Sequence, residues 1–418
     1  MATLRAALEM GIGGRTCVGY GSSGPAKGDL LFECGLEGQG PAAKLLDGTP
    51  EFRPTMFRAA IRGMALRLFG GVTDERTARQ VVGRLFGSIS PDDDKDVNVG
   101  LMATAYTDAS SELGSFGWDK YRQPTYATSG RLQWRLTRRC ETGEDKALLA
   151  KLLGALHGLT MSLGGFGRGW RRPDHRIFYP GYDKRQIGCH WQWRDAASLP
   201  PFIHVQSPAD LARLLQTAQR LARRWLDATT RPTRGGPAPW REVIHPARMN
   251  IWTRKATGPK DAEAVAWFHS AMEADRETGQ PTDPCHLKGS DLAGRMNQVG
   301  LIWNRLLPLL TPGQVTTPAK AAQPANPLAR PVNPTARPAN PMARPPSVAR
   351  GRPSARRHPA GQSQGDVSIA AHQGEYLEIL VLHALPNNPT PEAIQHHQRF
   401  IAEMNLGAGV DFHPVNWS

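Results

Sequence analysis

The sequence predicts an α+β protein with two similar halves and one long segment without a fold of its own. Three observations support this prediction. Stretches with helical spacing of apolar residues alternate with short strand-like segments. A glycine-rich turn occurs twice, each time beside arginine. One internal segment is rich in proline and arginine and has too little apolar surface to form a core. At 418 residues the chain is long enough for two or three domains.

The first half contains the clearest succession of elements. Asp29–Cys34 has the composition of a short strand, and Thr55–Phe69 carries apolar residues at helical spacing before a pair of glycines. Val97–Thr107 and Arg131–Arg138 alternate like strands, and Asp145–Gly158 is a second amphipathic helix. The order strand–helix–strand–strand–helix–strand predicts a ferredoxin-like (RRM-like) fold.

The second half is expected to be a degenerate copy of the first. Ile203–Val205 is a candidate strand, and a helix is expected to start after Ser207, which is a good N-cap before Pro208. Near the end, Leu301–Leu310 and Tyr376–Leu382 resemble two strands. Pro391–Met404 is the expected closing helix.

These elements give five expected divisions of the chain. Residues 1–24 form a tail with the first glycine loop, 25–180 the first domain and 181–310 the start of the second half. Residues 311–365 form an insertion rich in Pro, Ala and Arg, with a heptad echo of Asn-Pro-x-Ala-Arg-Pro, and 366–418 complete the second half. Proline at this density blocks helices and sheet ladders, so we expect the insertion to be disordered.

The charge balance indicates an anionic partner. The net charge is +14 and the isoelectric point is about 9.9, which favours nucleic acid or another polyanion. No apolar run approaches the roughly 20 residues of a membrane-spanning helix, so we expect no membrane partner. The five cysteines are scattered and odd in number, which is typical of reduced thiols. We therefore expect a cytoplasmic protein.

The two glycine loops are the strongest candidates for RNA contact. Glycine allows positive φ and a close approach of backbone N–H groups to phosphate, and arginine supplies a forked donor. The candidate RNA-binding residues in the two loops are Gly13, Gly14, Arg15, Thr16, Gly19, Tyr20, Gly21, Gly164, Gly165, Gly167, Arg168, Trp170, Arg171 and Arg172. Trp170 is also a candidate for base stacking, as are Trp191 and Trp193, although most tryptophans belong to cores.

The first helix supplies three further candidate RNA contacts. Arg58 and Arg62 are one turn apart and share a face, and Arg53 lies just before the helix. One interpretation is an ordinary solvated face. The alternative is an edge that contacts the sugar-phosphate backbone and fixes a strand without reading its bases.

The metal signals are weak. Cys140, His175, Cys189 and His190 are a candidate structural zinc site, but they lack the paired spacing of a typical zinc motif. The acidic loop Asp92–Asp96 offers oxygen ligands for magnesium, although such a run is more often a solvated loop. The sequence contains no Walker A, nucleophile-elbow or dinucleotide-binding motif.

Taken together, these motifs resemble the RAMP superfamily of type III CRISPR–Cas effectors. The resemblance is carried by Glu51–Arg62, by Leu85-Phe-Gly-Ser88 and by the glycine loop that follows. The N-terminal loop Gly11–Gly21 is similar to one that closes a RAMP unit, which suggests the tail of a preceding unit. The part from Gly300–Arg305 onward is similar to the last RAMP unit of subtype III-E single-chain effectors. A split or fused subtype III-D subunit is the alternative.

The resemblance implies a function in antiviral defence. It implies a subunit that binds CRISPR RNA, holds it for pairing with target RNA and contacts other RAMP subunits. It favours a non-catalytic RNA-binding unit within an RNA-cleaving complex. An alternative is an endoribonuclease in which Asp47, in the loop after the first strand, is catalytic with or without magnesium. A generic RNA-binding protein outside CRISPR is the third hypothesis.

Overall fold

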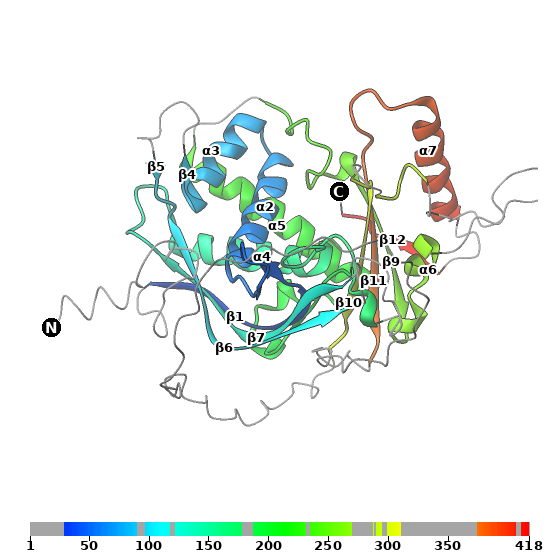
Figure 1. Cartoon of the computed structure of the whole chain (residues 1–418). Coiled ribbons are helices and arrows are strands. Elements are labelled where there is room, and N and C mark those ends of the chain that lie inside the picture. Colours follow the sequence, from blue (N-terminus) through cyan, green and yellow to red (C-terminus); the bar gives the residue numbers. More distant parts are fainter. Residues whose placement is uncertain are drawn as a thin grey trace, which may run out of the picture. The chain divides into compact units, whose positions relative to one another are not determined.

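The computed structural model describes residues 29–89, 97–117, 122–177, 187–230, 235–269, 287, 290–294, 299–310, 374–406 and 411–417. Over this part the chain is a mixed α+β structure with two four-stranded antiparallel sheets (Figure 1). The expected α+β class is therefore confirmed. The N-terminal tail, the acidic loop 92–96 and the Pro-rich insertion lie outside the described residues.

The first sheet is built from strands β1 (Leu30–Pro41), β6 (Met102–Phe116), β7 (Gln123–Leu136) and β8 (His190–Trp193). Their order in the sheet is β6-β7-β1-β8, and every neighbouring pair is antiparallel. β1 pairs with β7 from end to end, whereas β8 pairs with only four residues of β1. The last strand of the sheet is therefore a short edge strand.

Three helices accompany this sheet. Helix α2 (Thr55–Gly70) buries a stripe that includes Phe57, Ile61 and Leu68, as its spacing predicts. α2 and α4 (Lys146–Leu163) pack against each other, and α4 also packs on β1 (Figure 1). The next two helices, α3 (Glu75–Phe86) and α4, each have an aspartate N-cap, Asp74 and Asp145, whose side chain accepts from backbone N–H groups of the first turn.

Two short hairpins lie outside the first sheet. β2 (Ala43–Lys44) pairs with β3 (Pro50–Glu51) between β1 and α2. β4 (Ser88–Ile89) pairs with β5 (Val97–Asn98) between α3 and β6. The first hairpin carries the loop that contains Asp47, so it determines where that residue lies.

Helix α5 (Pro208–Thr229) follows the first sheet and packs along α4. It starts as expected: the Ser207 hydroxyl accepts from the Asp210 N–H at 3.2 Å, and Pro208 occupies the first helical position. The strand expected at Ile203–Val205 is wrong. Pro201–Ile203 forms a 3-10 turn instead, because two successive prolines, Pro200 and Pro201, cannot donate to a sheet ladder.

The second sheet is built from β9 (Met249–Ala256), β10 (Ile302–Pro308), β11 (Tyr376–His383) and β12 (His413–Pro414). Their order is β10-β11-β9-β12, again antiparallel throughout. The two strands expected near 301–310 and 376–382 are thus present, as direct neighbours. They pair although a long stretch of sequence separates them.

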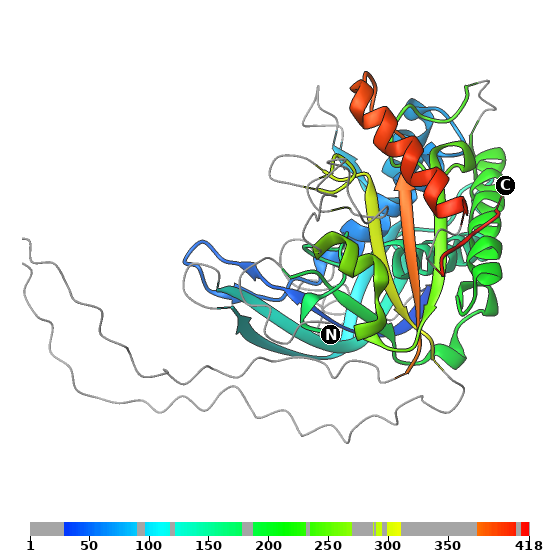
Figure 2. The same ribbon diagram turned by 90° about the vertical axis from the view of Figure 1, so that its right-hand side faces the viewer.

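Two helices belong to the second sheet. α6 (Glu263–His269) follows β9, and α7 (Pro391–Leu406) follows β11. Phe400 of α7 packs edge-on against Trp252 of β9 with ring centres 6.1 Å apart. Figure 2 shows α7, in red, lying against this sheet. No helix of the described part is both long and apolar enough to cross a membrane.

The sheets divide the chain differently from the expected boundaries. β8 belongs to the first sheet, so that sheet extends past the expected limit at residue 180. The second sheet begins only at β9, well inside the segment 181–310. Neither strand was predicted, because β8 has only four residues and six of the eight residues of β9 are buried.

A buried arginine connects the two halves. Arg305 on β10 is 3% exposed, and its guanidinium donates to the carbonyl oxygens of Met161 at 3.1 Å, Cys189 at 3.2 Å and Trp191 at 3.5 Å. The first of these carbonyls lies in the last turn of α4, and the last lies on β8. One side chain therefore holds the second sheet against a helix and an edge strand of the first half.

Candidate nucleic-acid interface

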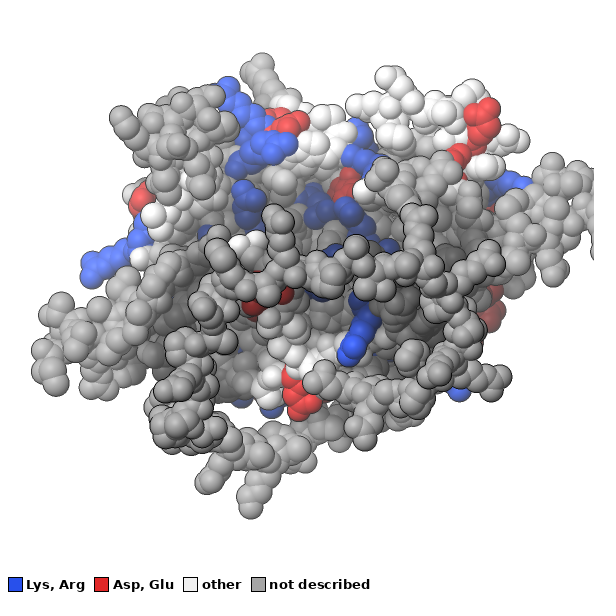
Figure 3. All heavy atoms as spheres, viewed as in Figure 1, with Lys and Arg blue, Asp and Glu red and all other residues white. Residues whose placement is uncertain are grey.

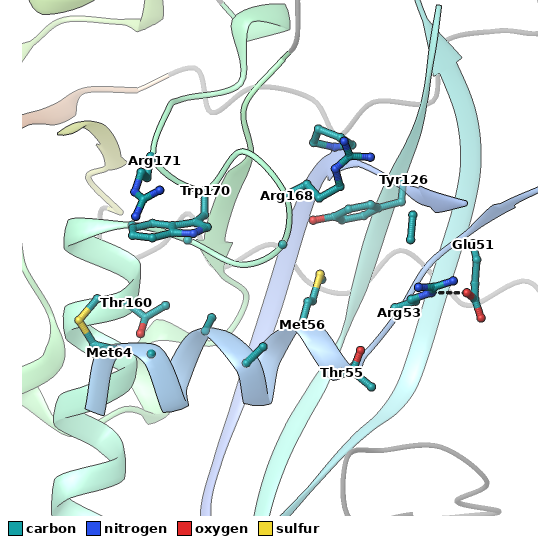
Figure 4. A pocket seen from close by; sticks show the side chains of 18 of the residues that line it. Glu51, Arg53, Thr55, Met56, Met64, Tyr126, Thr160, Arg168, Trp170 and Arg171 are labelled. Atoms are coloured by element: carbon teal, nitrogen blue, oxygen red, sulfur yellow. Dashed lines mark hydrogen bonds and ion pairs between the residues drawn. The ribbon is translucent and has the colours of Figure 1, made fainter. Parts of the chain in front are cut away.

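A groove lies between helix α2 and the glycine-rich loop 164–171, and its volume is ≈ 480 Å³. Figure 4 shows α2 on one side and the loop on the other, with Tyr126 extending from the sheet toward them. Residues from the end of β1 and from the β2–β3 hairpin complete the lining. The structure therefore brings the second glycine loop and helix α2 together, as the sequence suggested. The face of α2 at the groove is not the one that carries Arg58 and Arg62.

The face of α2 that lines the groove consists mostly of small or flexible side chains. It contributes Thr55, Met56, Ala59, Ala60, Gly63, Met64 and Arg67. These positions recur every three to five residues, so they form one stripe along the helix. The stripe lies beside the buried face and carries a single charge, at its C-terminal end.

The glycine loop is held in place by Phe166, which is fully buried. Its ring packs edge-on against those of Phe57 and Trp191, with centres 5.0 and 5.1 Å away. Its carbonyl oxygen accepts from the Trp191 indole N–H at 3.1 Å and from the Tyr126 hydroxyl at 3.5 Å. The loop is thus anchored at its centre while its flanking glycines line the groove.

Gly167 must be glycine at this place. Its φ is +88°, which side chains rarely adopt, and a Cβ here would lie 3.0 Å from the Met56 sulfur and 3.1 Å from the Tyr126 hydroxyl. The absence of a side chain lets the loop backbone approach α2 closely. At its glycines the wall of the groove is therefore bare backbone.

A buried ion pair fixes the far end of the loop. Arg176 donates to the Asp174 carboxylate at 2.8 Å, and the two side chains are 4% and 0% exposed. The Gln39 amide of β1 also donates to Asp174, at 3.2 Å. The segment that returns from the loop to β8 is therefore tied to the first strand of the sheet.

Two arginines lie at the end of the groove nearer the N-terminus of α2. Arg53 pairs with Glu51 of the hairpin and donates to the Lys44 carbonyl at 3.1 Å. Arg168 of the glycine loop is exposed and has no ion-pair partner among the described residues. Figure 4 shows Arg168 and Arg53 on opposite sides of this end.

Three arginines share one carboxylate near the other end. Glu242 accepts from Arg67 at 2.7 Å, from Arg171 at 3.2 Å and from Arg241 at 3.1 Å. These cations, with Arg67 the largest contributor, lower the pKa of Glu242 to about 2 against the opposing effect of burial. Three guanidinium groups facing one carboxylate leave this end positively charged.

Trp170 lies at the same end, beside two of these arginines. The guanidinium carbons of Arg67 and Arg171 lie 5.1 and 4.8 Å from the centre of its ring. Trp303 of β10 packs edge-on against it at 5.0 Å. His383, 4.1 Å from Trp303, adds no charge, because burial lowers its pKa to about 3. Figure 4 shows Trp170 across the groove from Met64.

One face of the described part carries more basic than acidic side chains. In the view of Figure 3, Lys and Arg side chains predominate over Asp and Glu in the described part of this face, above all in its middle and upper parts. Such a face attracts a polyanion at long range.

The structure separates the predicted RNA-binding residues into three groups. One group lines the groove: Arg53, Gly164, Gly165, Gly167, Arg168, Trp170 and Arg171. A second group does not line it: Arg58, Arg62 and Arg172. The third, the seven candidates of the first glycine loop (Gly13, Gly14, Arg15, Thr16, Gly19, Tyr20 and Gly21), lies outside the described residues.

Arg58 illustrates why sequence alone misplaced part of the site. Its guanidinium donates to the Phe86 carbonyl oxygen at the end of α3, so it supports that helix end. Arg62, one turn later on the same face, is exposed. Arg67, which the sequence argument missed, reaches the groove because it continues the stripe of Met56, Ala60 and Gly63.

Two further predictions are corrected. Trp191 is 0% exposed and Trp193 is 9% exposed, so neither is available for base stacking in this structure. No three His, Cys, Asp or Glu side chains of the described residues lie close enough to hold a metal ion. Among the zinc candidates, Cys140 lies near Arg138 and Glu144 after β7. His175 and Cys189 lie between the glycine loop and β8, and His190 is the first residue of β8.

Asp47 lies at the tip of the β2–β3 hairpin. Its carboxylate accepts from the Thr49 N–H at 2.9 Å, and this hydrogen bond lowers its pKa below the ordinary value. Gly48, at φ +86°, completes the turn. The side chain is exposed and ionised, and Ala43 and Glu51 of the same hairpin line the groove.

No protein-family model matches the chain, and no curated protein matches it. The inference of function therefore rests on the residues and on the geometry described above.

Proposed function

We propose that this protein is a CRISPR RNA-binding RAMP subunit of a type III CRISPR–Cas ribonucleoprotein. In this proposal it holds guide RNA for pairing with target RNA and contacts other RAMP subunits. The observation that carries the proposal is the groove itself. Helix α2, which follows the motif Glu51-Phe-Arg-Pro54, and the glycine loop 164–171 meet there, with arginines at both ends.

The arrangement of strands supports a ferredoxin-like fold for each half. In the first half, β1, α2, β6, β7, α4 and β8 follow one another in the chain, and α3 is an addition. Numbered along the chain, the four strands lie in the order 2-3-1-4. The second half, β9 to β12 with α6 and α7, has the same succession and the same order. RNA-recognition modules commonly use this fold.

The chemistry of the groove supports RNA as the ligand. Backbone N–H groups of a glycine loop and exposed guanidinium groups are the usual donors to phosphate. An apolar stripe between the two charged ends suits bases or riboses rather than a free anion. These features belong to a chain with a net charge of +14.

The test is to isolate the full chain from cells that express a CRISPR array and to sequence the RNA that co-purifies. The proposal expects short repeat-derived RNA. Replacing both Arg53 and Arg168 by Ala should weaken RNA binding and reduce the slope of log K against log salt by about 0.7 for each phosphate that is no longer neutralised. The matched control replaces Arg213 and Arg399, whose side chains are 63% and 42% exposed on other helices. An RNA-free preparation, or random cellular RNA only, would contradict the CRISPR assignment.

A second candidate function is cleavage of the bound RNA at Asp47. The observation in its favour is the place of this residue, exposed at the tip of a hairpin whose base lines the groove. An ionised carboxylate there can accept a proton from a 2′-hydroxyl or bind a metal. In the assembled complex, Asp47→Ala should abolish target cleavage while RNA binding is kept. Unchanged cleavage would exclude this role.

A further inference from the structure

We propose that the exposed face of helix α5 is a second RNA-binding surface, which contacts the sugar-phosphate backbone outside the groove. The residues of this surface, the α5 arginine patch, are Arg84, Arg220, Arg223, Arg224 and Arg248. They do not line the groove between α2 and the glycine loop. The inference rests on the proposed RNA-binding function and adds a separate place of contact.

Helix α5 carries three of these arginines on one exposed side. Residues three and four apart are neighbours on the surface of a helix, so Arg220 lies next to both Arg223 and Arg224. All three are exposed, whereas Leu221 and Trp225 on the other side of the helix are buried. At a rise of about 1.5 Å per residue, the three positions span about 6 Å along the helix axis. The fold therefore concentrates three positive charges within about one turn.

Two arginines from other elements extend the patch. Arg84 of α3 is exposed and donates to the Thr229 carbonyl oxygen at 3.2 Å, at the C-terminal end of α5. Arg248 lies in the turn before β9. Burial lowers the pKa of His245, and the positive charges of Arg223 and Arg248 lower it further, so both guanidinium groups lie near this imidazole. The patch thus combines α3, α5 and the turn before β9.

The arginines of the patch have no carboxylate partners. None of them forms an ion pair with another residue in the part of the chain that the structure describes. Arg220 donates instead to the neutral hydroxyl of Thr217 at 3.2 Å. Asp227 is exposed one turn beyond Arg223, yet it forms no ion pair with a described residue either. The guanidinium groups therefore keep their charge available for an anion from outside.

Other exposed arginines on helices are paired. Three of them each have a carboxylate about one turn away: Arg79 with Glu75 on α3, Arg213 with Asp210 on α5, and Arg399 with Glu403 on α7. Such pairs stabilise a helix, whereas like charges one turn apart, as at Arg220 and Arg224, destabilise it. The patch therefore costs the free protein some stability, and a bound polyanion would remove that cost.

The composition of this face favours RNA over an acidic protein. Protein interfaces usually have an apolar centre, and none of the large apolar side chains that are exposed in the described part lies on α5. The patch offers guanidinium groups, whose forked donors match the oxygens of phosphate. Contacts with phosphate alone do not read bases, so we expect binding that is independent of sequence.

The experiment measures the salt dependence of RNA binding by the full chain. The patch variant carries Arg220→Ala, Arg223→Ala and Arg224→Ala, and fluorescence anisotropy with a labelled oligouridine of about 30 nucleotides follows binding at salt concentrations from about 50 to 200 mM. Each phosphate contact that is lost should reduce the slope of log K against log salt by about 0.7, so three should reduce it by about 2. Over this fourfold rise in salt, the wild type should lose about 20-fold more affinity than the variant.

The matched control removes the same number of charges from arginines that have carboxylate partners. It carries Arg79→Ala, Arg213→Ala and Arg399→Ala, at side chains that are 60%, 63% and 42% exposed. Its slope should stay close to that of the wild type. Thermal unfolding checks the fold, and the patch variant should melt no earlier than the wild type, because the substitutions remove contacts between like charges.

The outcomes separate the two proposals. A slope as steep in the patch variant as in the control overturns this inference and leaves an acidic protein as the partner of this face. If Arg53→Ala with Arg168→Ala reduces the slope in that case, the proposed contact at the groove still stands. A slope that falls only in the patch variant supports the surface on α5 and contradicts the contact at the groove. If the wild type binds no RNA, both proposals fail.

Discussion

The two halves share a succession of elements and a strand order, but they use their arginines in opposite ways. In the first half, Arg168 is exposed at the groove, and Arg67 and Arg171 divide one carboxylate between them and a third arginine. In the second half, Arg254 and Arg305 are 8% and 3% exposed, and their guanidinium groups donate to the Asp261 carboxylate and to backbone carbonyl oxygens of the protein. The same scaffold thus presents exposed arginines at a groove in the first half and buries arginines within its second half.

In the second half, the buried polar contacts that stabilise the fold are clearest around Glu378 of β11, which is fully buried. Its carboxylate accepts from the backbone N–H groups of Glu263 and Ala264 at 2.9 and 3.0 Å, at the start of α6. Asn304 donates to it at 3.2 Å, and Arg254 pairs with it at 3.3 Å. This network fixes a short helix on the second sheet, at a place where the longer α2 of the first half faces a groove.

The contrast extends to the titration of two glutamates. Neighbouring arginines lower the pKa of Glu242 to about 2, whereas burial raises the pKa of Glu378 to about 7. The ionised carboxylate of Glu242 therefore stabilises the folded state at neutral pH, whereas the protonated carboxyl of Glu378 stabilises it in acid. An excess of cations around one carboxylate is what a site for an anionic ligand needs.

The largest expected effect is the loss of the arginine that connects the halves. Arg305→Ala leaves three buried carbonyl groups without their donor and creates a cavity between β10, α4 and β8. We expect the free energy of unfolding to fall by about 3 kcal/mol or more, measured by urea denaturation. Arg399→Ala, at an exposed i,i+4 pair, is the control and should change it by less than about 0.5 kcal/mol. A small loss for Arg305→Ala would mean that the halves are not coupled through this side chain.

The contacts of Arg305 with the first half are an example of what the sequence could not predict. Helices α2 and α4, the start of α5 and the strands at 302–308 and 376–383 follow from local spacing and capping. β8 and β9 do not, because β8 has only four residues and β9 is buried at six of its eight positions. No local pattern indicates that Arg305 would reach the end of α4.

The site was predictable in part for the same reason. The glycine loop is recognisable by composition, and it does line the groove. The face of α2 toward it was not predictable, because arginines at 58 and 62 suggested a contact surface while the groove uses the neighbouring stripe of small residues. Glu242 lies far away in sequence from the arginines Arg67 and Arg171 that it joins. Long-range partners of this kind leave no local signal.

The second prediction concerns pH. Because the pKa of Glu378 is about 7 in the folded state and 4.5 in the reference state, its protonated form stabilises the fold below pH 4.5. That contribution is lost as the pH rises to 7, and a shift of this size corresponds to about 3 kcal/mol. Glu378→Gln should remove this part of the pH dependence. Urea denaturation between pH 4.5 and 7.5 measures it, and a constant difference between variant and wild type would contradict the assignment.

The third prediction tests the bare wall of the groove. Gly167→Ala places a Cβ at φ +88°, 3.0 Å from the Met56 sulfur, so we expect a loss of about 1–2 kcal/mol in the free energy of unfolding. RNA affinity should fall as well, since the loop must move away from α2. Gly236→Ala is the matched control, because nothing lies within 4 Å of the added Cβ there. Equal stability of the two variants would show that the loop does not depend on this close approach.

The smallest expected effect on stability is that of a substitution at the groove. Arg168 is exposed, and no described residue forms an ion pair with it, so Arg168→Ala should change the free energy of unfolding by less than about 0.5 kcal/mol. RNA affinity should nevertheless fall, and more at low salt than at high salt, because one phosphate is no longer neutralised by a guanidinium group. Arg305→Ala should show the reverse, with a large loss of stability. If Arg168→Ala destabilises the fold by more than about 1 kcal/mol, this arginine supports the fold, and the first half resembles the second in how it uses charge.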